Sequence, residues 1–586
     1  MNFTSFINKN ADEFLRKPAL GFKKDNEWKE INWTVFRTII FKIANALREN
    51  GIKENDKVAI YSENCAEWIC FDLAIMALGA ITVPIYATSN TEQAAFVLKD
   101  SAAKIVLVGN QEQYDSAFEI IENSEFLEKI VVIKKAVWIK KEKTEYLENF
   151  MKHGKEAFEI VDKKEDDVAT LIYTSGTTGV PKGVMLTHGN FQKCVEAHFD
   201  FFKFENFVNE HSLAFLPLTH VFERSWTLLC LYGGAKVSFL ENPKLIANAL
   251  TEVKPSLMCS VPRFYQKIYG GIQEMVNSSS ESKKKIFNWA LKIGGEVAEL
   301  KRNNKSVPFG LSFKNSIANK MVFNKIKNKL GGNLWFMPCG GASISAEVTK
   351  FFDAMGIHIT VGYGLTETTA TLTAFPFKNY EHGTAGKPLG NTQIKIGENE
   401  EVLAKGDGVM KGYYNLPEET AKVFTEDGWF RTGDAGKFDE KGNLVITDRI
   451  KDLMKTSNGK YIAPQPIENL LSNNNLVQQV MLVAEDKPFV AALIVPNFEF
   501  LQEKLKEMNI PFTNWKEIVE LTQIKELYKS KIEEVQKELS GVEKVKKFVL
   551  MPSEFEISSG EITPTLKIKR NIVLHKYKEL IDSMYA

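Results

Sequence analysis

The stretch that decides the fold is Val168-Ala-Thr-Leu-Ile-Tyr173, followed directly by Thr174-Ser-Gly-Thr-Thr-Gly-Val-Pro-Lys-Gly183. The first six residues predict a buried strand, because they form a short apolar run. The next ten combine glycines that admit backbone amides to phosphate oxygens, hydroxyl donors, and the positive charge of Lys182. A P-loop is excluded, because two residues separate Gly179 from Lys182 and a glycine follows the lysine. The stretch therefore predicts a polyphosphate-binding loop at the end of a strand. Its spacing differs from that of the P-loop.

Strand and helix patterns alternate on both sides of this stretch. Strand-like runs occupy residues 58–61, 81–86, 104–108 and 130–133 upstream, and 212–216 and 235–240 downstream. Helical patterns at 65–78, 91–98 and 114–121 separate the upstream runs. This alternation predicts parallel sheets covered by helices on both faces.

The character of the chain changes past Asp434. Short strand signals at 443–447 and 479–483 precede charged helical sequence at 515–539, which predicts a smaller α+β domain. The charged run Asp448-Arg-Ile-Lys-Asp452 is a suitable linker, because exposed polar segments separate domain cores. We therefore expect an α/β protein with a large N-terminal domain, residues 1–448, and a small C-terminal domain, residues 449–586.

Composition limits the class of protein. The 586 residues are 44% hydrophobic and 25% charged, as in folded soluble chains. Lys plus Arg (74) equal Asp plus Glu (74), which argues against a nucleic-acid partner because the chain has no overall positive field. Six scattered cysteines without metal spacing are consistent with a reducing cytoplasm. The longest uncharged stretch, 73–91, is interrupted by Gly79 and Pro84, so we expect no membrane span there.

Further motifs follow the phosphate stretch in order. Tyr363-Gly-Leu-Thr-Glu367 offers an aromatic face, a hydroxyl and a hard carboxylate ligand, which suit ATP and Mg²⁺. Gly340-Gly-Ala342 is small enough to admit a flat base. With Phe430-Arg-Thr-Gly-Asp434 and Asp448-Arg-Ile-Lys-Asp-Leu453, these segments resemble the adenylate-forming superfamily of acyl-CoA synthetases, adenylation domains and luciferases. The resemblance covers about residues 30–580.

The resemblance implies a role for each matching residue. Thr174, Ser175, Gly176, Thr177, Thr178, Gly179 and Lys182 would bind phosphates; Gly341, Ala342, Tyr363 and Gly364 would bind adenine; Asp434 would accept the ribose hydroxyls, and Arg449 would contact the nucleotide. Thr366 would touch phosphate, and Glu367 with Thr174 would hold Mg²⁺.

The same resemblance assigns residues of the second domain. Lys451 would be the hinge of a mobile C-terminal domain. Lys567 would bridge the carboxylate and the α-phosphate, and its context, Thr563-Pro-Thr-Leu-Lys567, is typical of the long-chain branch. Lys569 is the alternative for this role. His220 would lie near the acyl and phosphate groups, although a lone histidine is more often a packed or capping residue than a catalyst.

The activity implied is that of an AMP-forming long-chain fatty acid–CoA ligase. A fatty carboxylate attacks the α-phosphorus of ATP, and coenzyme A then displaces AMP from the acyl adenylate. Two alternatives stay open, an acyl carrier protein as acceptor and a nucleotide-binding scaffold without turnover. No pattern predicts the acyl chain length or the oligomeric state.

Residues 283–330 are strongly basic within a chain whose net charge is zero. They contain two acids, Glu296 and Glu299, and twelve Lys or Arg, Lys283, Lys284, Lys285, Lys292, Lys301, Arg302, Lys305, Lys314, Lys320, Lys325, Lys327 and Lys329. Interleaved aromatic and aliphatic residues allow two interpretations. The segment either lies on anionic lipid at the inner face of the membrane or is a solvated helical face whose apolar residues pack inward.

Overall fold

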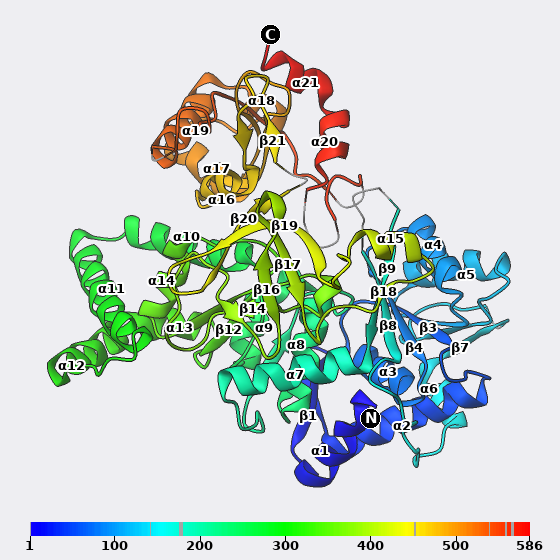
Figure 1. The fold of residues 1–586 in the computed structure, drawn as a ribbon. Helices are drawn as coiled ribbons and strands as arrows, with labels where there is room; N and C mark the ends of the chain where they lie inside the picture. Colours follow the sequence, from blue (N-terminus) through cyan, green and yellow to red (C-terminus); the bar gives the residue numbers. More distant parts are fainter. Residues whose placement is uncertain are drawn as a thin grey trace.

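The computed structural model describes residues 2–140, 142–174, 180–450, 453–537, 539–556, 559–563 and 568–586. A large N-terminal part of sheets and covering helices carries a separate, smaller C-terminal domain (Figure 1). The predicted α/β class is therefore confirmed.

The largest sheet has eight strands in the order β18-β9-β8-β4-β3-β5-β6-β7. Their bounds are β3 Lys57–Tyr61, β4 Ile81–Ile85, β5 Ile105–Val108, β6 Lys129–Val132, β7 Thr144–Tyr146, β8 Val168–Thr174, β9 Lys182–Thr187 and β18 Gly412–Tyr413. The strands from β7 to β8 are parallel, as predicted. The last two pairings, β8 with β9 and β9 with β18, are antiparallel. The segment between β8 and β9, residues 175–181, is too short for the crossover connection that two parallel strands would need.

Helices cover both faces of this sheet, because alternate residues of each strand belong to different cores. Val58 and Ile60 pack in the core that contains α3 (Ala66–Ala77), whereas Ala59 and Tyr61 pack with α4 (Thr91–Ser101) and α5 (Gln111–Glu122). The uncharged stretch 73–91 becomes the end of α3, the strand β4 and a loop. No helix within the described ranges is long and apolar enough to cross a membrane.

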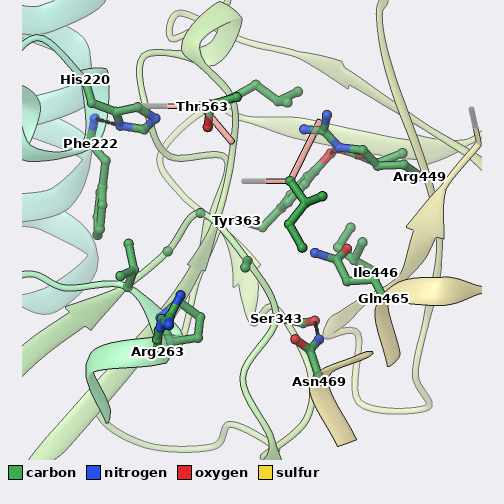
Figure 2. A pocket seen from close by; sticks show the side chains of 18 of the residues that line it. His220, Phe222, Arg263, Ser343, Tyr363, Ile446, Arg449, Gln465, Asn469 and Thr563 are labelled. Carbon is green, nitrogen blue, oxygen red and sulfur yellow. Dashed lines mark hydrogen bonds and ion pairs between the residues drawn. The ribbon is translucent and has the colours of Figure 1, made fainter. Parts of the chain in front are cut away.

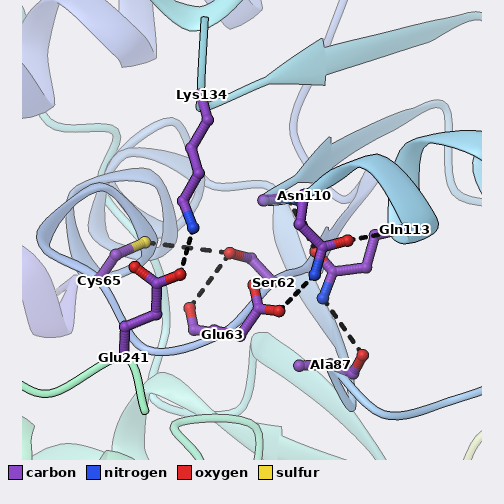
Figure 3. A network of polar contacts seen from close by, with 9 residues as sticks. Ser62, Glu63, Cys65, Ala87, Asn110, Gln113, Lys134 and Glu241 are labelled. Atoms are coloured by element: carbon purple, nitrogen blue, oxygen red, sulfur yellow. Dashed lines mark hydrogen bonds and ion pairs between the residues drawn. The ribbon is translucent and has the colours of Figure 1, made fainter. Parts of the chain in front are cut away.

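Polar contacts tie together the loops at the carboxyl ends of these strands (Figure 3). Asn110 caps α5 by accepting from the backbone N–H of Gln113 at 2.9 Å, and its amide donates to Glu63 Oε1 at 2.5 Å. Lys134, after β6, pairs with Glu241, after β11 (Lys236–Phe239). These contacts stabilise the loops at the strand edge where doubly wound sheets place their ligands.

Three smaller sheets complete the N-terminal part, in the orders β10-β11-β1-β2, β12-β13-β14-β15 and β16-β17-β19-β20. Their other strands are β1 Pro18–Lys24, β2 Glu27–Asn32, β10 His211–Ala214, β12 Phe336–Cys339, β13 His358–Tyr363, β14 Thr373–Ala374, β15 Lys387–Pro388, β16 Gln393–Ile396, β17 Glu401–Lys405, β19 Phe430–Phe438 and β20 Leu444–Arg449. The remaining helices are α1 Phe6–Phe14, α2 Trp33–Glu49, α6 Leu147–Phe150, α7 His188–Phe202, α8 Val221–Tyr232, α9 Ile246–Val253, α10 Pro262–Asn277, α11 Glu281–Arg302, α12 Phe309–Ala318, α13 Asn324–Lys329, α14 Ala346–Ala354 and α15 Pro417–Lys422.

The C-terminal domain contains a three-stranded sheet, β23-β24-β25, buried on both faces. Its elements are β21 Met454–Lys455, β22 Tyr461–Ile462, β23 Val477–Val483, β24 Ala491–Pro496, β25 Lys547–Leu550, α16 Pro464–Ser472, α17 Phe498–Glu507, α18 Trp515–Ile518, α19 Thr522–Val535, α20 Arg570–Lys576 and α21 Lys578–Ser583. The helical sequence 515–539 divides into α18 and α19. The strand predicted at 443–447 is β20, which pairs with β19 of the large part.

Candidate active site

A cavity of about 2710 Å³ lies at the carboxyl ends of β12 and β13 and extends to the C-terminal domain (Figure 2). The predicted site residues that the structure describes all line it, namely Thr174, Lys182, His220, Gly341, Ala342, Tyr363, Gly364, Thr366, Glu367, Asp434 and Arg449. Ser175, Gly176, Thr177, Thr178, Gly179, Lys451 and Lys567 lie outside the described residues. Segments separated by more than two hundred residues therefore meet at one cavity.

Tyr363, Asp434 and Arg449 form one group: Tyr363 and Arg449 end β13 and β20, and Asp434 lies in the middle of β19. Asp434 and Arg449 are direct partners in the β19–β20 ladder, which sets the Arg449 Nε to Asp434 Oδ1 distance at 3.4 Å. The Tyr363 hydroxyl donates to Asp434 Oδ2 at 2.7 Å. Burial and the charge of Asp434 raise the pKa of Tyr363 well above its usual value, so this hydroxyl stays protonated. An aromatic ring, a carboxylate and a guanidinium thus face the same cavity.

Glu367 lies in a second polar group, in the single-turn helix Thr366–Thr368 after β13. Burial raises the pKa of its carboxyl, while a hydrogen bond from Tyr413 and the charge of Arg449 oppose that shift. The Tyr413 hydroxyl donates to Glu367 Oε1 at 2.9 Å, and Lys182 Nζ lies 5.1 Å from the centre of the Tyr413 ring. Lys182 Nζ also pairs with Glu419 at 2.5 Å. A cation and a desolvated carboxylate therefore flank one tyrosine.

Magnesium fits this second group. Across the described part of the chain no three His, Cys, Asp or Glu side chains gather as a metal cage. Mg²⁺ usually binds through one or two carboxylates together with substrate phosphates and water. A cation beside the desolvated Glu367 carboxylate would favour its charged form. Thr174, whose register partner across β8 and β9 is Lys182, adds a hydroxyl at the same cavity.

Two glycines are required by the backbone around the cavity. Gly341 has a backbone φ of +87°, which residues other than glycine rarely adopt. At Gly364, an added Cβ would lie 2.2 Å from the carbonyl oxygen of Ala370. The chain after β13 can therefore fold back closely only with glycine at this position, which aims Thr366 and Glu367 at the cavity.

His220 is the N-cap residue of α8. Its Nδ1 accepts from the backbone N–H of Phe222 at 3.2 Å, so this nitrogen carries no proton. This hydrogen bond caps the N-terminus of α8, which agrees with the interpretation of His220 as a capping residue. Glu223, in the first turn of α8, is completely buried, and burial raises the pKa of its carboxyl to about 8.

Part of the cavity lining, which we call the apolar branch, comes largely from α7 and α8. Its walls are mostly aromatic and aliphatic and come from α7, α8, β12 and β13, namely Phe191, Val195, Phe202, Val221, Phe222, Trp226, Leu229, Phe336 and Val361. Cys194 and His198 of α7 also line it, and burial raises the pKa of the Cys194 thiol to about 12. These apolar side chains line the same cavity as the polar residues of β13 and β19.

At the C-terminal domain, Lys569 and Arg570 both line the cavity. Arg570 Nη2 pairs with Glu468 at 2.8 Å and Nη1 donates to the Leu482 carbonyl, which fixes the start of α20 on α16 and β23. Because Lys567 is outside the described residues, the choice between Lys567 and Lys569 stays a prediction.

Tyr413 and Arg263 line the cavity and were not in the predicted set, and neither was Glu419, which pairs with Lys182. Tyr413 and Glu419 reach the site through β18 and α15, and no local pattern marks either as a ligand group. Arg263 is the second residue of α10 and lines the cavity (Figure 2). Burial lowers the pKa of its guanidinium. A charged residue after an uncharged run, Leu257 to Pro262, was the available sequence signal for it.

Comparison with known families decides the identity. Residues 7–414 match the AMP-binding enzyme family, and residues 451–586 match the C-terminal domain of AMP-binding enzymes. The chain belongs to the AMP-binding enzyme family. Both matches agree with the large part and the separate small domain seen in the structure.

Full-length relatives within the family are named as long-chain enzymes. The long-chain-fatty-acid–CoA ligase FadD15 of Mycobacterium bovis is 31% identical over 96% of this chain and 93% of its own length. Long chain acyl-CoA synthetase 4 of Arabidopsis thaliana is 30% identical over 98% and 90%. The long-chain-fatty-acid–CoA ligase ACSBG1 of Homo sapiens is 29% identical over 97% and 83%.

Solved structures of AMP-binding enzymes share the fold. The anthranilate CoA ligase AuaEII with anthranoyl-AMP superposes with a TM-score of 0.76 at 18% identity, covering 100% of this chain and 98% of that one. ATP-bound MatB from Rhodopseudomonas palustris gives a TM-score of 0.72 at 20% identity, covering 99% of each. At this identity the likeness establishes the fold alone.

Proposed function

We propose that this protein is an AMP-forming long-chain fatty acid–CoA ligase. The observation that carries the proposal is a single cavity with a polar end, formed by Tyr363, Glu367, Asp434 and Arg449, and an apolar branch lined largely by α7 and α8. The names of the full-length relatives support a long-chain acid as substrate and coenzyme A as acceptor.

The polar end binds ATP in this proposal. The Tyr363 ring and the small residues Gly341 and Ala342 enclose adenine, and Asp434 accepts hydrogen bonds from the ribose hydroxyls. Lys182 and the Thr174 hydroxyl hold phosphate oxygens, with residues 175–179 of the same stretch. Magnesium bound at Glu367 supplies positive charge that offsets the phosphates.

In the first step, the fatty carboxylate attacks the α-phosphorus, an acyl adenylate forms and pyrophosphate leaves. Lys567 donates to the carboxylate and α-phosphate oxygens and stabilises the charge that develops there. Arg449 and Thr366 orient the nucleotide. The apolar branch excludes water from the acyl group, which protects the adenylate from hydrolysis.

In the second step, the thiol of coenzyme A attacks the acyl carbonyl and AMP leaves. No protein nucleophile is needed, in keeping with the raised thiol pKa of Cys194. The C-terminal domain, residues 449–586 in this proposal, rotates about Lys451 between the two steps. That rotation withdraws Lys567 and admits the thiol.

The proposal is tested with purified protein, ATP, Mg²⁺ and saturated fatty acids of increasing chain length, offered with coenzyme A or with acyl carrier protein. We expect thioester formation with long-chain acids and coenzyme A. Transfer to acyl carrier protein alone would support the alternative acceptor. Nucleotide binding without any thioester would support the scaffold, and both results would contradict the proposal.

A further inference from the structure

The basic segment 283–330, which we call the basic arm, forms a helical projection at one side of the molecule. It contains most of α11 together with α12, a π-helical turn at Asn319–Phe323, and α13. Figure 1 shows α11 and α12 at the left edge of the molecule, with α12 outermost. On its inner side α11 packs on α14, and α12 packs back on α11.

The structure divides the apolar residues of the basic arm into two sets. The first set is buried in one core with α14 and includes Phe287, Ala290, Ala318, Phe323, Ile326 and Leu330. The second set is exposed to solvent: Ile286 at 39%, Trp289 at 37%, Phe309 at 88%, Phe313 at 62% and Met321 at 46%. Inward packing accounts for the first set only.

Phe309 and Phe313 are the most prominent members of the exposed set. They are four residues apart on α12, so both rings lie on the same face of the helix. Exposure of two neighbouring phenylalanine rings to water is unfavourable, and such exposed apolar groups mark interaction sites. The outermost helix of the arm thus presents an apolar face that the fold leaves uncovered.

The positive charge of the basic arm is also left largely uncompensated. Among the described residues, a single ion pair involves the twelve basic side chains, between Lys284 and Glu281. Lys327 donates to the Asn319 side chain, and Lys329 contacts Met275. Burial and the nearby Lys301 lower the pKa of Lys327, as expected where positive charges lack acidic partners. The sequence of the arm carries a formal net charge of +10, from twelve bases and two acids, and few of these bases have an acidic partner in the described structure.

We propose that the basic arm docks this protein reversibly on the surface of an anionic lipid bilayer. Phe309 and Phe313 enter the headgroup layer, and the surrounding lysines bind the anionic headgroups. Eleven of the twelve bases are lysines, whereas nucleic-acid recognition favours the planar fork of arginine. Together with the exposed aromatic rings, this composition fits a lipid surface better than a nucleic acid. This proposal is independent of the proposed reaction.

The test measures co-sedimentation of the full chain with phosphatidylcholine vesicles and with vesicles that also contain phosphatidylglycerol. The charge variant carries Lys314→Glu, Lys320→Glu and Lys325→Glu, and the apolar variant carries Phe309→Ser and Phe313→Ser. We expect binding to the anionic vesicles only, weakened by salt. The charge variant should lose on the order of 100-fold in partitioning, at the usual strength of a basic residue near an anionic surface. The apolar variant should lose roughly tenfold and keep its salt dependence.

Matched controls lie elsewhere on the surface. The triple variant Lys506→Glu, Lys516→Glu and Lys537→Glu makes the same change in net charge, and Trp138→Ser removes an aromatic ring that is 70% exposed. Both controls should bind as the unchanged protein does, and circular dichroism checks the fold of each variant. The two arm variants test the proposal separately, so misfolding of one leaves the other decisive. Absent binding, equal binding to neutral vesicles, equal loss in the controls, or binding to RNA instead of vesicles would overturn the proposal.

Discussion

At the scale of single residues, the polar end of the cavity is held by contacts among its own members. Tyr363 donates to Asp434, Arg449 pairs with the same carboxylate, and Tyr413 donates to Glu367. Each of these groups is therefore oriented before a ligand arrives, which reduces the entropy lost on binding. The Tyr413 side chain contacts both Lys182 and Glu367, the two oppositely charged groups beside it.

The role of Lys567 gives the first residue-scale prediction. Lys567→Ala should slow acyl adenylate formation by ~10²–10³-fold, because it removes one cation that acts only while charge develops at the α-phosphate. Transfer from supplied acyl adenylate to coenzyme A should be retained. Pyrophosphate exchange and single-turnover thioester synthesis measure the two steps. The matched control is Lys569→Ala; if it alone impairs the first step, Lys569 has the role given to Lys567.

Glu223 gives a prediction about pH. Burial raises the pKa of its carboxyl from 4.5 to about 8, so across this window the folded protein keeps a proton that the unfolded chain releases. Stability contributed at this site is therefore greatest at low pH and falls as the pH rises through the window. Glu223→Gln keeps an acceptor for the Leu216 N–H, which donates to Glu223 at 3.1 Å, and cannot ionise.

The Gln variant should consequently lose less stability than the unchanged protein between about pH 5.5 and about pH 8. Thermal unfolding midpoints at both pH values measure the difference. Glu440→Gln, at an exposed position, is the control and should leave the pH dependence unchanged. An identical pH dependence in Glu223→Gln and the unchanged protein would show that Glu223 is not the titrating group.

At the scale of elements, a buried ion pair joins α8 to α3 and β8. Arg224 and Asp72 are both 0% exposed, Arg224 Nε donates to Asp72 Oδ2 at 2.9 Å, and Nη1 donates to Thr170 at 2.8 Å. These bonds fix α8, and with it the apolar branch, against the central sheet. Neither residue was singled out in the sequence, since charged residues inside an apolar helix carry no sign of their partner.

Removal of one member of this pair should be strongly destabilising. Asp72→Ala leaves the Arg224 charge buried without compensation, for an expected loss of about 3–5 kcal/mol in the free energy of unfolding. Urea unfolding followed by fluorescence measures this loss. Asp12→Ala breaks the pair of Arg37 with an aspartate that is 70% exposed and should cost about 0–1 kcal/mol. Equal losses in the two variants would contradict the structural role of Asp72.

At the scale of the whole molecule, local patterns predicted the elements well and their long-range pairings less well. The runs at 58–61, 81–86 and 104–108 became β3, β4 and β5, because buried parallel strands are continuous apolar runs. The antiparallel β18 and the apolar branch were not predicted. β18 pairs with β9 across more than two hundred residues, and an apolar cavity wall has the same composition as an apolar core. The order of the motifs predicted a set of polar residues, and those that the structure describes line one cavity.

The most direct test of the central claim is the product stoichiometry of the purified protein with ATP, Mg²⁺, a long-chain fatty acid and coenzyme A. Chromatography of the nucleotides and thioesters measures all products in one reaction. The proposed function predicts one AMP and one pyrophosphate for each acyl-CoA formed, with no AMP when the fatty acid is omitted. Release of ADP, or AMP formation that does not depend on the fatty acid, would contradict it.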